Sequence, residues 1–127
     1  MTQLVIPLAP VAWQRVKTGR YGQSYVPPAT RRFKNEFVKL ARKYAPQEPW
    51  GGAIKLTIVF FIKRPKRPKC RAVPMTRPDL DNYLKGVLDA CNGIFWVDDG
   101  QVVEFFVAKE WALDGKPRIH MQVEELA

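Results

Sequence analysis

Two aspartates one residue apart, Asp79 and Asp81, have the type and spacing to take part in phosphate chemistry in this 127-residue chain. They lie near the start of the segment RPDLDNYLKGVLDA, residues 77–90, and an acidic turn containing Asp99 follows it. A hard divalent cation, most simply Mg²⁺, takes oxygen ligands and keeps several waters, so aspartates from separate elements can hold it against a phosphate. We therefore expect the carboxylates of Asp79, Asp81 and Asp99 to come within about 5 Å of one another. Wide separation of the three would argue against a shared ion.

Lys85 lies one helical turn after Asp81, and its role depends on that of the aspartates. Beside a metal-bound phosphate, Lys85 would orient the attacking water or stabilise the growing negative charge. A simpler interpretation stays open, in which Asp79 caps a helix, Asp81 and Lys85 form an exposed ion pair, and residues 98–100 form an Asp-Asp-Gly turn. Asn82 would support a carboxylate in the first interpretation and is a surface amide in the second.

The net charge of +9 is distributed unevenly along the chain. Residues 1–78 contain 17 lysines and arginines against 2 acidic residues, whereas residues 79–127 contain 4 against 10. Lysines and arginines that neutralise phosphates release counterions and gain affinity, so the basic half indicates a polyanionic partner. Carboxylates near a phosphate backbone are repulsive unless a cation lies between them. The basic residues expected to hold backbone phosphates are Arg15, Lys17, Lys63, Arg64, Lys66, Arg67, Lys69, Arg71 and Arg77.

Composition excludes several other kinds of site. The chain has one histidine, His120, and two cysteines, Cys70 and Cys91, neither of which lies in a CxxC. Zinc sites and histidine general bases need residues that are scarce here, so any chemistry must come from carboxylates, lysines and hydroxyls. No apolar run approaches the roughly 20 residues of a membrane helix and no secretion signal is recognisable, so we expect a cytoplasmic protein with reduced cysteines.

The hydrophobic pattern predicts one mixed α+β domain over residues 1–127, with two main helices packed against a β-sheet. The expected order is strand, loop, helix, strand, basic loop, helix, strand, strand. Strands are expected at residues 3–9 near a sheet edge, at 53–62 in the centre, and at 101–111 and 117–126, with a further short strand at 94–97. Prolines and seven basic residues make 63–77 an irregular cationic loop.

The first helix is expected over residues 29–44, with Thr30 as a candidate cap. The second begins in the 77–90 segment and ends at residue 90 or 91, because Asn92-Gly93 is a natural helix stop. Its apolar stripe is expected to consist of Leu80, Leu84, Val87 and Leu88.

Residues 77–111, RPDLDNYLKGVLDACNGIFWVDDGQVVEFFVAKEW, resemble the signature region of the RusA family of Holliday junction resolvases, small endodeoxyribonucleases of phages and prophages. The matched pattern is P-D-L-D-N-x-x-K, then D-A, then D-D-x-Q-V, then a lysine at the end of the next strand, Lys109. A looser resemblance to the phage branch runs through WQRVK and YVPP before it. The resemblance therefore extends over nearly the whole chain.

The resemblance implies essential acidic positions at Asp79, Asp81 and Asp99 and a catalytic lysine at Lys85, with Asp98 at a recurrent acidic position. It further implies a homodimer, dependent on Mg²⁺ or Mn²⁺, whose two sites nick opposing strands of a four-way junction in DNA recombination and repair in a bacterial host cell. Two other functions remain open from the residues alone. One is a non-catalytic nucleic-acid-binding protein whose aspartates only cap a helix and form a turn, and the other is a less selective flap or branched-DNA nuclease.

Overall fold

A four-stranded mixed sheet forms the centre of the protein in the computed structural model, which describes residues 1–14 and 17–126. The strand order is β1-β6-β4-β5, in which β4 and β5 are parallel and the other neighbours are antiparallel. The expected mixed sheet is confirmed, with the first strand at an edge and the 53–62 strand inside. The strands are β1 Thr2–Ile6, β4 Ile54–Lys63, β5 Val102–Ala112 and β6 Arg118–Glu125.

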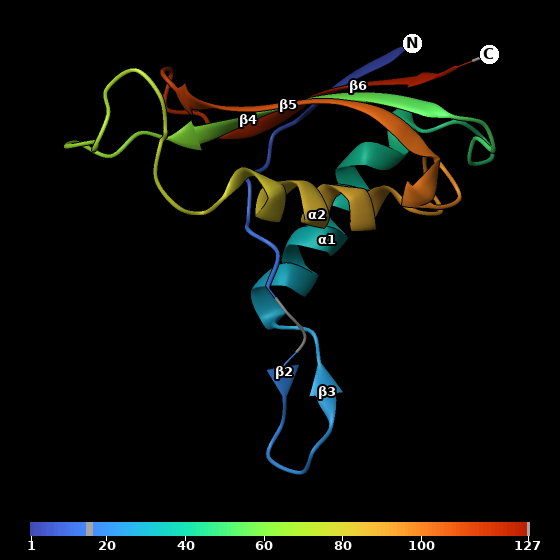
Figure 1. Ribbon diagram of the computed structural model, residues 1–127, viewed down its shortest axis with the longest axis horizontal. Coiled ribbons are helices and arrows are strands. Elements are labelled where there is room, and N and C mark those ends of the chain that lie inside the picture. Colours follow the sequence, from blue (N-terminus) through green and yellow to red (C-terminus); the bar gives the residue numbers. More distant parts are fainter. Residues whose placement is uncertain (15–16, 127) are drawn as a thin grey trace.

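Two helices cover one face of this sheet and leave the other face open (Figure 1). They are α1, Pro28–Ala41, which continues into the short 3₁₀ turn η1, Arg42–Tyr44, and α2, Leu80–Cys91. In β4 every second side chain from Ile54 to Phe60 is buried, as expected for a strand with one face against helices. On α1, Phe33 and Phe37 recur at helical spacing and are buried in the core.

The chain from β4 through α2 to β5 is a crossover between two parallel strands. Because parallel strands point the same way, the loop before α2 leaves from the end of β4 and the loop after α2 returns to the start of β5, at the opposite end of the strands. Figure 1 shows this arrangement, with the 64–79 loop at the left end of the sheet and the short 3₁₀ turn η2, Asp99–Gln101, at the right end. This topology determines where the acidic residues lie.

Three local expectations were wrong. Residues 94–97 form a turn rather than a strand, because Gly93 has φ 80° and the backbone folds back, leaving only isolated bridges at Trp96. Thr30 lies inside α1 and is not its cap; its hydroxyl accepts a hydrogen bond from the backbone N–H of Gln14. The leucines of α2 are only half-buried, so the buried face of this helix differs from the expected stripe. It comprises Tyr83, Gly86, Val87, Ala90 and Cys91.

A small hairpin, β2 Lys17–Thr18 and β3 Ser24–Tyr25, projects from the helix side of the molecule away from the sheet (Figure 1). Arg15 and the side chain of Lys17, both expected to bind phosphates, lie outside what the structure describes. Both cysteines are free. Over the described residues, no helix is long and apolar enough to cross a membrane.

Candidate active site

Asp79 occupies the N-cap position of α2, but its carboxylate does not cap the helix. Its backbone is extended, as at an ordinary cap, yet no N–H in the described chain donates a hydrogen bond to its side chain. A capping aspartate normally accepts a bond from the second or third helical N–H. Asp79 is exposed, so its two oxygens are available to another group.

Asp81 and Lys85 are both exposed on the first turns of α2 and do not form the ion pair of the simpler interpretation. The ion pairs of the described residues are Lys34–Asp89 and Asp114–Arg118, each with an N···O distance of 3.0 Å. The helix start therefore presents two carboxylates and one ammonium group that do not neutralise one another by direct contact.

The backbone leading into α2 is held from two sides. The ammonium group of Lys109, near the end of β5, donates hydrogen bonds to the carbonyls of Thr76 at 2.8 Å and Pro78 at 3.0 Å. The backbone N–H of Trp13 donates to the carbonyl of Asn82 at 2.9 Å. Lys109 is part of the matched sequence pattern, but the sequence did not indicate what it does. The only hint of a role was its regular position after Asp98 and Asp99. These bonds determine where Asp79 and the first turn of α2 lie.

Asp98 and Gln101 fix the turn that carries Asp99. The carboxylate of Asp98 accepts a hydrogen bond from the N–H of Gly100 and caps η2, so Asp98 has a structural role. The side-chain oxygen of Gln101 accepts bonds from Val97 and Asp98, and its amide donates to two carbonyls just before β4. The D-x-x-Q spacing of a capping box could have identified this turn from the sequence.

Asp99 and the α2 aspartates lie at opposite ends of the crossover within one chain. Asp79 is beside the end of β5, through Lys109, whereas Asp99 immediately precedes the start of β5. The 12 residues of α2 alone span about 18 Å. Consistently, no group of three or more His, Cys, Asp or Glu side chains within residues 1–14 and 17–126 is arranged to hold a metal ion. The expectation that the three carboxylates converge is not met within a single chain.

A comparison with protein families identifies the chain. The model of the family described as "Endodeoxyribonuclease RusA" matches residues 7–124. The chain belongs to the RusA family. It is therefore a Holliday junction endodeoxyribonuclease, and its substrate is DNA.

The chain is also similar to a curated bacterial protein. It is 30% identical over 112 residues to the uncharacterized protein YqaN of Bacillus subtilis (strain 168). The aligned region covers 80% of this chain and 78% of that protein. This likeness extends over most of both chains.

The basic segment expected to bind phosphates runs from Lys63, at the end of β4, through the loop that follows this strand. Its seven expected phosphate-binding residues are all exposed, and in the part of the chain that the structure describes none is paired with a carboxylate. Lysines and arginines without a carboxylate partner can bind phosphates without first breaking an ion pair. They are Lys63, Arg64, Lys66, Arg67, Lys69, Arg71 and Arg77.

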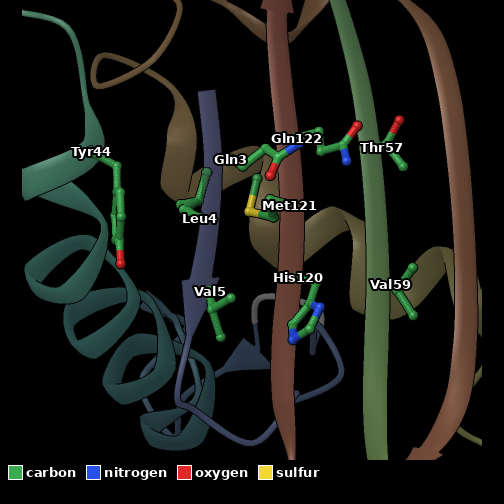
Figure 2. Close-up of a pocket in the computed structure, with 9 residues that line it drawn as sticks. All are labelled: Gln3, Leu4, Val5, Tyr44, Thr57, Val59, His120, Met121 and Gln122. Carbon is green, nitrogen blue, oxygen red and sulfur yellow. The ribbon is translucent and has the colours of Figure 1, made fainter. Parts of the chain in front are cut away.

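A hollow of about 410 Å³ elsewhere on the protein does not have the chemistry of a nuclease site. Figure 2 shows its side chains spread over β1, β6 and β4, with Tyr44 at one side. They include amides, two hydroxyls and His120 but no carboxylate and no lysine. The acidic residues of the RusA pattern all lie outside it.

Proposed function

We propose that this RusA protein resolves four-way DNA junctions by Mg²⁺-dependent hydrolysis, with paired nicks in opposing strands, and that Mn²⁺ can substitute. The observation that carries the proposal is the family match over residues 7–124, combined with the exposed carboxylates at the start of α2, of which that of Asp79 does not cap the helix. RusA family nucleases are typically metal-dependent. Exposed carboxylate oxygens are the ligands that Mg²⁺ prefers, so the residues present fit the ion.

In this proposal Asp79, Asp81 and Asp99 are the metal ligands. Bound Mg²⁺ would polarise the scissile phosphate and favour deprotonation of the attacking water. Lys85, exposed one turn after Asp81, supplies positive charge as negative charge grows on the phosphate. Lys109 is a positioning residue, because its ammonium group holds the backbone just before Asp79.

We propose that a second copy of the chain completes the ligand set, because Asp99 and Asp79 lie at opposite ends of α2 in one chain. The outer edge of β5 supports this, since among the described residues no strand pairs with it. Val103, Phe105 and Phe106 of β5 are 60%, 49% and 62% exposed, and neighbouring strand residues point to opposite faces, so the edge is apolar on both faces. Uncovered strand edges of this kind readily pair with another chain.

Antiparallel pairing of β5 with the partner's β5 about a twofold axis would bring the separated groups together. The start of one strand then lies beside the end of the other. With Phe105 on the axis, Gln101 lies opposite the partner's Lys109, and Asp99 lies beside the segment that leads into the partner's Asp79. Each site would combine the two aspartates of α2 from one protomer with the η2 aspartate of the other.

The same symmetry suits paired nicking. A twofold axis perpendicular to the sheet keeps both helix layers on one side of a continuous sheet. The two sites would lie at the two ends of the paired strands, eight residues or about 26 Å apart. Two equivalent sites on one face match the two equivalent strands of a symmetric four-way junction.

The proposed activity is tested with a synthetic four-way junction, incubated with and without Mg²⁺ and again with Mn²⁺. We expect paired nicks that require the metal. Asp81→Asn should abolish cutting but retain junction binding, or strengthen it, because one negative charge near the phosphates is removed.

Linear duplex and flap substrates of the same sequence provide the specificity control. Faster cutting of the flap than of the junction would support the less selective branched-DNA nuclease instead. An intact junction at every magnesium and manganese concentration, with binding retained, would favour a non-catalytic nucleic-acid-binding protein and refute the proposal.

A further inference from the structure

The apex of the β2–β3 hairpin is an ordered turn that presents two side chains to solvent. The N–H of Gly22 donates to the carbonyl of Gly19 at 3.1 Å, which makes Arg20 and Tyr21 the central residues of a four-residue turn. The side chain of Gln23 accepts a hydrogen bond from the N–H of Tyr21 at 3.0 Å. Gly22 has φ 81°, a conformation that glycine adopts without strain. The local hydrogen bonds thus fix the apex without help from the rest of the protein.

The exposed apex residues contribute little to the packing of the fold. Tyr21 is 86% exposed, and Arg20 is exposed and takes part in no ion pair of the described residues. The first 35 residues of the sequence contain no aspartate or glutamate. An aromatic ring next to an arginine, in a segment without negative charge, suits the stacking bases and the phosphates of a nucleic acid.

The root of the hairpin is attached to the start of α2. Trp13 donates its backbone N–H to the carbonyl of Asn82, and Gln14 donates to the hydroxyl of Thr30 on α1. The chain therefore leaves the body beside the turn that carries Asp81 and Lys85. From Trp13 to Tyr21 are eight residues, which can span at most about 28 Å. The apex can thus reach DNA well away from the phosphate being cut.

We propose that Tyr21 stacks on a base at the branch point of the junction while Arg20 binds a phosphate beside it. This rests on the proposed junction cleavage and adds an element that recognises the branch. Bases inside a continuous duplex are covered on both faces by their neighbours, whereas a base where the arms separate has an uncovered face. An aromatic side chain held on a preformed turn can cover that face at little cost in conformational entropy. The hairpin would therefore favour branched DNA over linear duplex.

The test compares the dissociation constants of a four-way junction and a linear duplex, measured without divalent metal so that no strand is cut. Tyr21→Ala should weaken junction binding about tenfold, as expected for loss of one stacked base, and leave duplex binding nearly unchanged. Tyr21→Phe keeps the ring and should bind as the wild type does. A fluorescent adenine analogue at the branch point should be quenched by the wild type and by Tyr21→Phe but not by Tyr21→Ala.

Arg42→Gln is the matched control for Arg20→Gln. Both changes remove one exposed positive charge, but Arg42 lies in η1, beyond the other end of α1. Arg20→Gln should lower the salt dependence of junction binding by about one phosphate contact. Arg42→Gln should leave the preference for junction over duplex unchanged.

Two outcomes separate this inference from the proposed function. An unchanged ratio of junction to duplex affinity in Tyr21→Ala, with wild type still cutting junctions, would overturn the role of the hairpin alone. A wild type that binds junctions but never cuts them would overturn the proposed function, and the binding ratios would still decide the role of Tyr21.

Discussion

The side chain of Gln101 connects the turn that carries Asp99 to the body of the protein. It accepts two hydrogen bonds, from the N–H groups of residues 97 and 98, and donates two, to the carbonyls of Trp50 and Gly52. Gln101→Ala removes all four and should lower the free energy of unfolding by about 2 kcal/mol, measured by urea denaturation. It should also slow junction cleavage, since Asp99 loses its fixed position.

Gln101→Glu distinguishes the two halves of this network. It keeps an oxygen that can accept from residues 97 and 98 but loses the donor to Trp50 and Gly52. Its stability should therefore lie between that of wild type and Gln101→Ala. Equal stability of all three proteins would show that the side chain does not hold the turn.

His120 should make the stability of the protein depend on pH. Burial lowers the pKa of His120 from its ordinary value of 6.5, and the charge of Arg118 lowers it further. The Nε of Arg118 also donates to Nε2 of His120 at 3.1 Å, which requires that nitrogen to be unprotonated. Because the unfolded chain binds the proton first as pH falls, the stabilisation is fully present above about pH 6.5 and is lost as pH falls through the folded pKa.

Urea unfolding between pH 8 and pH 5 measures this dependence. The free energy of unfolding should fall below about pH 6.5 in the wild type, and His120→Gln should lack that part of the decrease. Identical pH profiles for the two proteins would mean that His120 titrates alike in the folded and unfolded states.

At the scale of elements, α2 contains a glycine that its packing does not require. A Cβ at Gly86 would lie 3.6 Å from the ring of Phe33 and 3.7 Å from the carbonyl oxygen of Val11, which is ordinary contact. Gly86→Ala should therefore raise the free energy of unfolding by about 0.5–1 kcal/mol, because alanine has less freedom to lose on folding.

Gly93 provides the opposite case at the end of the same helix. Its φ of 80° is unfavourable for alanine, although its surroundings are open, so Gly93→Ala should destabilise the protein by about 1 kcal/mol. A lower free energy of unfolding for Gly86→Ala than for the wild type would instead show that α2 has no room for a Cβ at Gly86.

The strands and helices could largely be predicted from the sequence because their hydrophobic periods are clear. The alternation in β4 and the helical spacing of Phe33 and Phe37 correspond to buried faces. The strand predicted at residues 94–97 was wrong because a short apolar run is compatible with any buried segment. Here Phe95 and Trp96 fill the core from a turn. The leucines of α2 were predicted to be buried but are only half-buried, because hydrophobicity alone does not show which residues of an apolar helix face lie deepest in the core.

The separation of Asp99 from Asp79 is a property of the whole molecule that the motif could not reveal. The spacing of aspartates along the chain says nothing about which end of the strands each one reaches. The strand-helix-strand order did contain a signal, since such a unit pairs its strands in parallel and places the two loops at opposite ends of the strands. Whether a second chain brings them together depends on an interface, and the signal for it is an edge strand with exposed phenylalanines.

The proposed pairing of β5 predicts a dimer that one charge would disrupt. Phe105→Asp places a negative charge beside the twofold axis, where it would face its own copy without a counterion. We expect the mass in sedimentation to fall from dimer to monomer and metal-dependent cleavage to be lost. Leu113→Asp, at a residue that is 77% exposed just beyond the end of β5, is the control and should remain dimeric.

Mixed dimers of two inactive variants test whether each site is shared between protomers. Asp81→Asn and Asp99→Asn should each be inactive alone. If the ligands come from different chains, their mixed dimer contains one site with every aspartate intact, so nicking returns and singly nicked junctions accumulate. The reciprocal dimer, wild type with the double variant Asp81→Asn/Asp99→Asn, has no intact shared site and should be inactive. Sites formed within one chain would reverse both results, because only the wild-type protomer of the second dimer would then cut.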